Sequence, residues 1–309
     1  MLQIRMLTAL LLVAPAVMAQ DDLSKMFGKD SVSGGPVIAT FKSTRIINGQ
    51  SNETLKKGEL DFRVAHRFGD LGGDAGGSKT FFGMDNSTDI RIAFEYGITD
   101  RLMVGVSRAK GSGNFSQLYE GLAKFKILQQ TMDNRIPLAI TVFGSAVVTG
   151  MKSSEVESDA NYFDNFSSRM NYTGQVILSR KFGNILSLAV LPTYIHRNRV
   201  VHMDVNDMFA VGVGGRLRFS KRLALVVDYF LPFREQASKD YFEGRGVKFY
   251  NPLGVGLEIE TGGHVFSVNF TNSTAILENQ FIPETTSTWM EGQFRWGFNI
   301  SRRFSLGGK

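Results

Sequence analysis

The residues best suited to catalysis in this sequence are its four histidines, because an imidazole exchanges a proton near neutral pH. His202 has the most suitable neighbours, since Asp204 and Asp207 follow it closely. A histidine with two carboxylates fits a metal site or a protease-type hydrolase. Exposed polar loops commonly have the same composition, however. We therefore expect no catalytic residue, no metal site and no cofactor, and we keep a hydrolase as an alternative.

Charged residues form a second, larger set, because they recur at alternate positions between apolar residues. One group comprises Glu95, Lys126, Arg216, Arg218, Glu258 and Glu260, and a more basic group comprises Arg67, Arg91, Arg169 and Arg197. Charges that face a common interior have two interpretations. They line water and select ions or solutes, or they pair and fill a narrow space, since a desolvated charge needs a partner.

The alternation that carries these charges predicts β-strands. In ELDFRVAHRF (59–68) and DIRIAFEYGI (89–98), apolar residues occupy every second position and most residues between them are polar. Successive side chains of a strand point to opposite faces, so each segment is one strand with an apolar and a polar face. We count twelve such strands, the last at 290–301. Glycines inside them, including Gly214 and Gly254, mark bends or leave room for a plug.

The connections between these strands alternate in length. The short ones centre on Thr99-Asp100, Gly183-Asn184, Ser220-Lys221 and Thr261-Gly262, and the long ones cover 69–87, 150–167, 232–248 and 273–289. A transmembrane β-barrel has short periplasmic turns and long extracellular loops. Strand length and aromatic residues near the strand ends favour a barrel over a soluble β-sandwich. We predict an all-β, closed antiparallel transmembrane β-barrel of about 12 strands.

The N-terminal part of the chain precedes the predicted barrel. Residues 1–19 have the pattern of a cleaved signal peptide, with Arg5, an apolar run and small residues Val17 and Ala19 before the cleavage point. Residues 20–57 begin polar and rich in Gly and Ser and contain a short β-prone core at Thr44–Ile47, which predicts a periplasmic arm or a plug-like segment. Residues 58–309 form the predicted barrel.

Composition excludes several other classes of protein. No second apolar stretch is long enough to be a membrane-spanning helix, and the chain has no Cys, so no disulfide framework holds the fold. The net charge of +6 comes without a basic run interleaved with aromatics, so we expect no nucleic-acid partner. The partners that we expect are outer-membrane lipids, small solutes and a periplasmic protein bound through the N-terminal arm.

Several segments also suggest a family. GELDFRVAHRFGD, EYGITDRLMVGV, TGGHVFSVNFTNS and the terminal FNISRRFSL resemble an uncharacterised family of bacterial outer-membrane β-barrels, known only as a domain of unknown function. The resemblance covers roughly residues 40–306. It implies a barrel in the bacterial outer membrane, and it implies neither a catalytic residue nor a substrate.

These patterns together predict a narrow passive pore for small polar or anionic solutes. The basic group at Arg67, Arg91, Arg169 and Arg197 attracts anions into the outer half of such a pore. Arg216 and Arg218 lie on one strand and Glu258 and Glu260 on the next but one, so we expect a constriction near the periplasmic end. The alternatives are a non-conducting barrel that anchors a periplasmic or surface complex, and an outer-membrane hydrolase.

Overall fold

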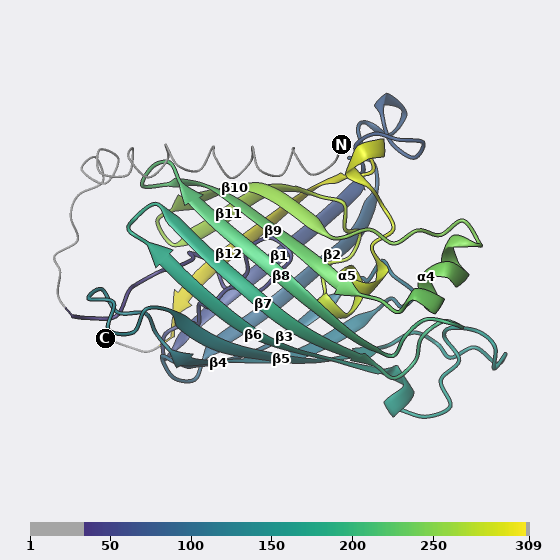
Figure 1. Cartoon of the computed structure of the whole chain (residues 1–309), viewed down its shortest axis with the longest axis horizontal. Coiled ribbons are helices and arrows are strands. Elements are labelled where there is room, and N and C mark those ends of the chain that lie inside the picture. The colour runs from purple at the N-terminus through teal and green to yellow at the C-terminus, as the bar shows by residue number, and fades with distance from the viewer. Residues whose placement is uncertain (1–33, 307–309) are drawn as a thin grey trace, which may run out of the picture.

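The computed structural model describes residues 34–306, which fold into a closed antiparallel β-barrel (Figure 1). The strands are β1 (Glu59–Asp70), β2 (Ser87–Gly97), β3 (Leu102–Ala109), β4 (Leu118–Leu128), β5 (Ala139–Thr149), β6 (Met170–Phe182), β7 (Leu186–Arg197), β8 (Asp207–Arg218), β9 (Leu223–Phe233), β10 (Leu253–Thr261), β11 (His264–Thr271) and β12 (Arg295–Ser305). Each strand pairs with its sequence neighbours, and β1 pairs with β12 to close the wall. The predicted fold class and strand number are confirmed. The predicted signal peptide, residues 1–19, lies outside the described residues.

The barrel is apolar outside and polar inside. Along β1 and β2 the burial alternates with period two, and the buried positions include Asp61, Arg63 and Arg91. Outward positions carry residues such as Phe94 and Val106, which are 48% and 62% exposed. The largest fully buried side chains are arginines. An apolar exterior around a polar interior is the arrangement that a lipid bilayer stabilises.

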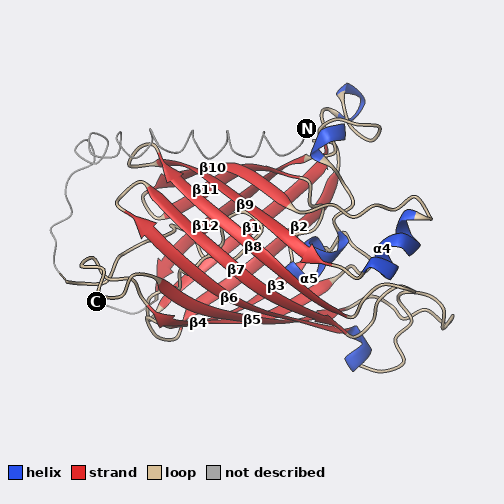
Figure 2. Cartoon of the chain, in the orientation of Figure 1, coloured by secondary structure: helices blue, strands red, loops and turns tan. Residues whose placement is uncertain are grey.

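The two ends of the barrel differ, as Figure 2 shows. One end has tight turns, two of which place Gly183 and Gly263 at positive φ (56° and 91°), the backbone region that glycine reaches without strain. The other end has long loops, which contain the helices α4 (Gln236–Glu243) and α5 (Glu278–Glu284) and three single 3-10 turns. By the usual orientation of such barrels, the turns face the periplasm and the loops face outward. No helix in residues 34–306 is long and apolar enough to cross a membrane.

The last strand begins later than the sequence predicts. Its alternating pattern was expected from Met290, whereas β12 begins at Arg295 and continues to Ser305. A 3-10 turn at Trp289–Glu291 precedes it and ends at Gly292, whose φ is 73°. A residue at positive φ breaks an extended strand, so pairing with β11 starts only after it.

The lumen is filled by two segments that are not part of the wall. The described part of the N-terminal arm, from residue 34 to residue 57, runs into the barrel from the short-turn end, and its residues from 43 to 52 are buried. The loop between β11 and β12 folds inward from the other end, and α5 within it is buried almost throughout. Ile46, Ile47 and Phe281 of these segments share one apolar cluster with Leu191 and Phe230 of the wall.

Candidate functional site in the barrel lumen

Residues 44–51 form a short β-hairpin inside the barrel, which we call the plug hairpin. Ser51 N donates to Thr44 O at 3.0 Å, and Ile46 N donates to Gly49 O at 2.8 Å. Isoleucine favours extended backbone, and Asn48 with Gly49 are residue types that turns prefer. Every residue of this hairpin is buried. The chain just before β1 therefore forms a hairpin that lies inside the lumen.

A single carboxylate on the wall holds the tip of the plug hairpin. Asp228 lies on β9, and its Oδ2 accepts hydrogen bonds from the backbone N–H groups of Ile47, Asn48 and Gly49 at 3.1, 2.6 and 2.8 Å. Consecutive N–H groups that converge on one anion form a concave binding site, and hydrogen bonds to an ionised acceptor are stronger than neutral ones. The tip is thus bound through its backbone, and the side chain of Asn48 adds a further hydrogen bond to Asp228 Oδ1 at 3.2 Å.

Two glycines of the wall make room for this tip. A Cβ at Gly214 on β8 would lie 2.2 Å from Ile46 Cδ1, and a Cβ at Gly254 on β10 would lie 2.9 Å from Ile47 Cγ2. Real carbon atoms do not approach so closely. A Cβ at Gly214 would displace the end of the Ile46 side chain, and a Cβ at Gly254 would also meet Asp228 Oδ1 at 2.7 Å. These two strand glycines thus leave room for the plug hairpin.

The base of the plug hairpin binds the opposite side of the lumen. Lys124 Nζ on β4 donates to Thr44 O at 2.7 Å and to Ser51 O at 3.0 Å, which joins the two arms of the hairpin. Thr44 Oγ1 donates to Glu95 Oε2 at 2.6 Å and accepts from Arg63 Nη2 at 2.9 Å. Buried charges at this site are therefore paired or hydrogen-bonded, as burial requires.

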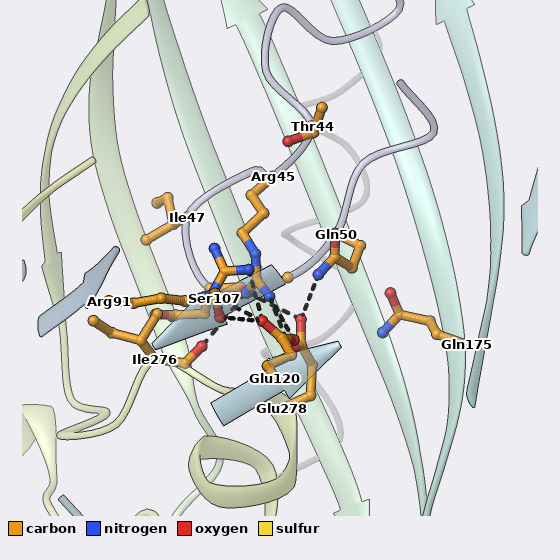
Figure 3. A network of polar contacts seen from close by, with 12 residues as sticks. Thr44, Arg45, Ile47, Gln50, Arg91, Ser107, Glu120, Gln175, Ile276 and Glu278 are labelled. Carbon is orange, nitrogen blue, oxygen red and sulfur yellow. Dashed lines mark hydrogen bonds and ion pairs between the residues drawn. The ribbon is translucent and has the colours of Figure 1, made fainter. Parts of the chain in front are cut away.

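The plug hairpin also binds the inward-folded loop (Figure 3). Arg45 forms an ion pair of 3.1 Å with Glu278 of α5, and Gln50 Nε2 donates to the same carboxylate at 2.9 Å. Next to this pair, Arg91 and Glu120 form a second buried ion pair of 2.7 Å. Arg45 and Glu120 are 3.8 Å apart, so the two pairs form one network.

A third set of contacts fixes α5 at the long-loop end. Arg197 pairs with Glu284 and with Asp204, each at 3.1 Å. Arg234 pairs with Asp204 as well, and its Nη2 donates to Pro283 O at 2.5 Å. The loops after β7, β9 and β11 are thereby tied together across the mouth of the barrel.

The carboxyl group of Glu284 is less acidic than usual. Burial raises its pKa above the ordinary value of 4.5, and the neighbouring Arg197 together with the N–H group of Asn114 only partly opposes this. Asp204, the second carboxylate at Arg197, also raises the pKa of Glu284. Ionisation of Glu284 is therefore less favourable in the folded protein than in water.

The six residues predicted to form a constriction all belong to strands, and two of them form a buried ion pair. Arg216 Nε and Glu258 Oε1 are 2.7 Å apart, and their side chains are 6% and 5% exposed. Glu260 instead pairs with Lys42 of the N-terminal segment at 3.1 Å. Lys126 and Glu260 line a cavity of about 520 Å³ at the short-turn end.

The two remaining residues of that group, and the basic group, have separate surroundings. Glu95 is buried against Thr44, and Arg218 is half-buried at the end of β8. Arg67, Arg91 and Arg197 are all buried in the lumen. Arg169 lies in a 3-10 turn before β6, where it donates to Met151 O at 2.5 Å. Roles for these residues in a constriction or in attracting anions stay predictions.

Comparison with known proteins adds a family to this geometry. Residues 41–304 match the model of a family described as a membrane bound beta barrel domain (DUF5777). The chain belongs to this family. A membrane-bound, closed antiparallel barrel with an even number of strands is the architecture of bacterial outer-membrane proteins, and this member is such a protein. The predicted resemblance and location are thus confirmed. No curated protein matches the chain in sequence.

Solved structures of similar architecture are outer-membrane porins and channels. An outer-membrane channel from Pseudomonas putida F1 has a TM-score of 0.48 and 12% identity, over 82% of this family member and 98% of that chain. KdgM porin has a TM-score of 0.46 and 10% identity over 80% and 99% of the two chains. NanC porin has a TM-score of 0.45 and 8% identity over 80% and 100%. At this identity the likeness concerns the barrel alone.

The hydrolase alternative gains no site from the geometry of this family member. The ring of His202 contacts Tyr241, whereas Asp204 pairs with two arginines and Asp207 hydrogen-bonds His196 at 2.7 Å. Among residues 34–306, no three His, Asp or Glu side chains are grouped to hold a metal.

A second histidine does lie beside a serine. His66 Nε2 and Ser87 Oγ are 3.1 Å apart on the outer face of the barrel. The other ring nitrogen of His66, Nδ1, is buried without a hydrogen-bond partner among the described residues. A serine nucleophile needs a base that a third group orients, and this pair does not have one.

Two residues that bind the plug hairpin, Glu95 and Arg67, were among the candidate site residues, whereas three of its principal anchors were not. Asp228, Lys124 and Glu278 gain their significance only from a hairpin that comes from a distant part of the chain. Two signals in the sequence pointed toward it: the β-prone Thr44–Ile47 followed by Asn48 and Gly49, and the glycines inside the strands. Neither signal shows which wall residues the hairpin meets.

Proposed function

We propose that this protein is a gated outer-membrane channel for small polar solutes, and that the plug hairpin is its gate. The observation that carries the proposal is the attachment of the hairpin tip to Asp228. One carboxylate binds three consecutive backbone N–H groups in the middle of the lumen. Release from Asp228 removes the largest single set of hydrogen bonds at the tip while the wall keeps its shape.

The wall does not depend on the gate for its own hydrogen bonds. Each strand pairs with two neighbours, and the ladder runs without a gap from β1 round to β12. The hydrogen bonds between the hairpin and the wall are replaced by bonds to water when the hairpin moves, so those to the charged groups of Asp228 and Lys124 contribute about 1.5–3 kcal/mol net each. Opening therefore requires displacement of a segment and no break in the barrel.

The N-terminal segment supplies a route for control. Pro36 forms a bridge with Thr131 in the turn between β4 and β5, and Val37 N donates to Gln130 O at 2.7 Å. The segment thus reaches the periplasmic mouth of the barrel. A periplasmic protein that binds the preceding part of the arm would pull on the plug hairpin directly, and this is the partner that we include in the proposal.

A permanently closed barrel that anchors a complex is the second candidate. Ile46, Ile47 and Leu55 pack in one apolar cluster with Leu191 and Phe230. A fully buried aliphatic side chain contributes about 1.5–3 kcal/mol, so withdrawal of three of them has a substantial cost. This packing favours a closed state, and only a conductance measurement separates a rarely open gate from an anchor.

A disulfide that locks the plug hairpin to the wall provides that measurement. In Ile46→Cys/Gly214→Cys the colliding Cδ1 is removed, and the Cβ of residue 214 lies 3.6 Å from the position that the sulfur of residue 46 replaces. This spacing is compatible with a disulfide. The chain has no other Cys, so no competing disulfide forms. Single-channel current is measured in a planar bilayer before and after reduction, with each single-Cys variant as a control.

A gated channel gives current that disappears on oxidation and returns on reduction. Both single-Cys variants should conduct under either condition. A protein that carries no current when reduced, at any voltage or salt concentration, would be an anchor. Current that is unchanged by the disulfide would show that solutes do not pass the plug hairpin.

A further inference from the structure

The lumen has one wall without charge. Within the described residues, the inward positions of β5, β6 and β7 carry no charged side chain between Lys181 at the periplasmic end and Arg197 at the outer end. The polar residues there are Thr141, Ser145, Thr149, Asn171, Thr173, Gln175, Ser179, Ser187 and Thr193. We call this surface the neutral wall. By contrast, β1, β2 and β4 carry nine buried inward charges: Asp61, Arg63, Arg67, Asp89, Arg91, Glu95, Glu120, Lys124 and Lys126.

The plug hairpin is attached to charged groups on strands at either side of the neutral wall. Its tip binds Asp228 of β9, and its base binds Lys124 of β4 through backbone oxygens. Within residues 34–306, Thr141 and Ser187 are the residues of the neutral wall that hydrogen-bond the N-terminal segment, through Asn52 O at 3.1 Å and Thr40 O at 2.5 Å. A movement of the hairpin away from β5, β6 and β7 therefore breaks these two hydrogen bonds and the apolar contacts of the shared cluster, but no ion pair.

Side chains of the neutral wall have unused hydrogen-bonding capacity. Thr173 Oγ1, Gln175 Oε1 and Ser179 Oγ are buried without a partner among the described residues, and each residue is 3% exposed. Gln175 extends from β6 into the lumen beside the Gln50 and Glu278 network (Figure 3), and its Nε2 donates to Thr193 Oγ1 at 2.8 Å. Burial of a polar atom without a partner is unfavourable. A solute with its own hydroxyl groups would supply the missing partners.

We infer that the permeation path runs between the plug hairpin and the neutral wall, and that its solutes are uncharged polyhydroxyl molecules of the sugar or polyol class. The inference rests on the proposed function. An ion that enters a narrow path needs countercharges or full hydration, and hydroxyl and amide groups provide neither in full. A hydroxyl group both donates and accepts, as do Ser, Thr and Gln side chains. Phe143, Ile177 and Leu191 lie among these groups and suit the C–H faces of such a solute.

Swelling of proteoliposomes tests this solute class with molecules of similar size and different charge. The full-length protein is reconstituted, and the initial rates are compared for sorbitol, which is neutral, and potassium gluconate, which supplies an anion. We expect sorbitol to enter faster. Gln175→Leu should lower the sorbitol rate by about two- to tenfold, the equivalent of one hydrogen bond. Val176→Leu, at the adjacent lipid-facing position of β6, is the matched control and should leave the rate unchanged.

Two charged variants at the same position report on the path itself. Gln175→Glu should shift the reversal potential in a salt gradient toward cations, and Gln175→Lys should shift it toward anions. Heat-modifiable gel mobility verifies that each variant is folded. Faster entry of gluconate than of sorbitol, or reversal potentials that ignore the charge at residue 175, would overturn the inference while leaving a channel. Entry of neither solute through wild type or through reduced Ile46→Cys/Gly214→Cys would instead refute the proposed function.

Discussion

Arg45 of the plug hairpin and Glu278 of α5 form an ion pair in the middle of the barrel, although their segments come in from opposite ends. Their side chains are 2% and 1% exposed. Gln50 donates to the same carboxylate, so two residues of the hairpin depend on one residue of the loop. The periplasmic and outer closures of the lumen are therefore coupled, and loosening one should loosen the other.

Arg45→Met is expected to destabilise the protein strongly. The substitution keeps most of the volume but leaves Glu278 buried without its ion partner, which costs about 3–5 kcal/mol. Urea-induced unfolding in detergent or lipid measures the change. Lys42→Met is the matched control, because Lys42 pairs with Glu260 at 29% and 33% exposure and such pairs contribute about 0–1 kcal/mol. Equal losses in the two variants would contradict burial of the Arg45 pair.

Arg216 and Glu258 should behave as a dry pair rather than as the lining of a wet pore. Removal of either partner alone is expected to cost about 3–5 kcal/mol, and removal of both should cost less than the sum because no unpaired charge remains. A double-mutant cycle with Arg216→Met and Glu258→Leu gives the coupling. A loss below about 1 kcal/mol in the single variants would indicate that water screens the pair.

Asp228→Asn should increase the fraction of time that the channel is open. The amide has nearly the shape of the carboxylate, but it carries no charge, which weakens the bonds from Ile47, Asn48 and Gly49. Its NH₂ group cannot accept, so with the amide oxygen at Oδ2 the bond from Asn48 Nδ2 to Oδ1 is lost. Limited proteolysis of residues 34–57 and single-channel recording follow the release. Asp133→Asn, in the exposed turn after β4, serves as a control. Unchanged protection and current in Asp228→Asn would show that the tip is held by its apolar contacts.

The stability of the outer closure should vary with pH through Glu284. Because burial raises the pKa of Glu284 in the folded state, the folded protein binds this proton more tightly than the unfolded chain does. The corresponding stabilisation is complete below the unfolded value of 4.5 and is lost as pH rises through the folded pKa. Glu284→Gln should flatten this part of the stability profile and be at least as stable at neutral pH. A profile identical to that of wild type would exclude Glu284 as its source.

The orientation of the barrel is open to a direct test. Epitope tags in 69–87, 150–167 and 232–248 should be labelled on intact cells, because long loops of such barrels face outward. Tags at Gly183 or Ser220 should be labelled only after the outer membrane is permeabilised. The opposite pattern would place the plug hairpin at the cell surface and remove the periplasmic route of control.

The sequence was sufficient to predict the wall because the wall follows a local rule. In β1 and β2 the large apolar residues face lipid and most charged ones face the lumen, so period two alone predicts the strands. The start of β12 was predicted wrongly, because Met290 and Phe294 continue the alternating pattern across Gly292. The alternation of apolar and polar residues does not reveal that Gly292 adopts a positive φ.

The contents of the lumen follow no local rule. Asp228 and Asn48 are separated by 180 residues in sequence, and nothing near either residue predicts their hydrogen bond. The loop 273–289 was expected at the outer surface, where loops of this length usually lie, whereas α5 is buried inside the barrel. The sequence does show many charged residues on the inward face of the strands. These charges are compatible with an open pore and with a filled interior.

One backbone oxygen near the hairpin tip bears on how the barrel closes. Ile47 O accepts from Arg67 Nη2 on β1 at 3.4 Å and from Asn299 Nδ2 on β12 at 3.1 Å, and Arg67 Nη1 donates to Asn299 Oδ1 at 3.2 Å. The first and last strands are the most distant in sequence, so their pairing is the contact with the largest loop-closure entropy. When the hairpin is bound to Arg67 of β1, the carbonyl oxygen of Ile47 is available to accept a hydrogen bond from Asn299 of β12. We therefore expect the segment that shuts the lumen to act as a template for the pairing of β1 with β12 during assembly.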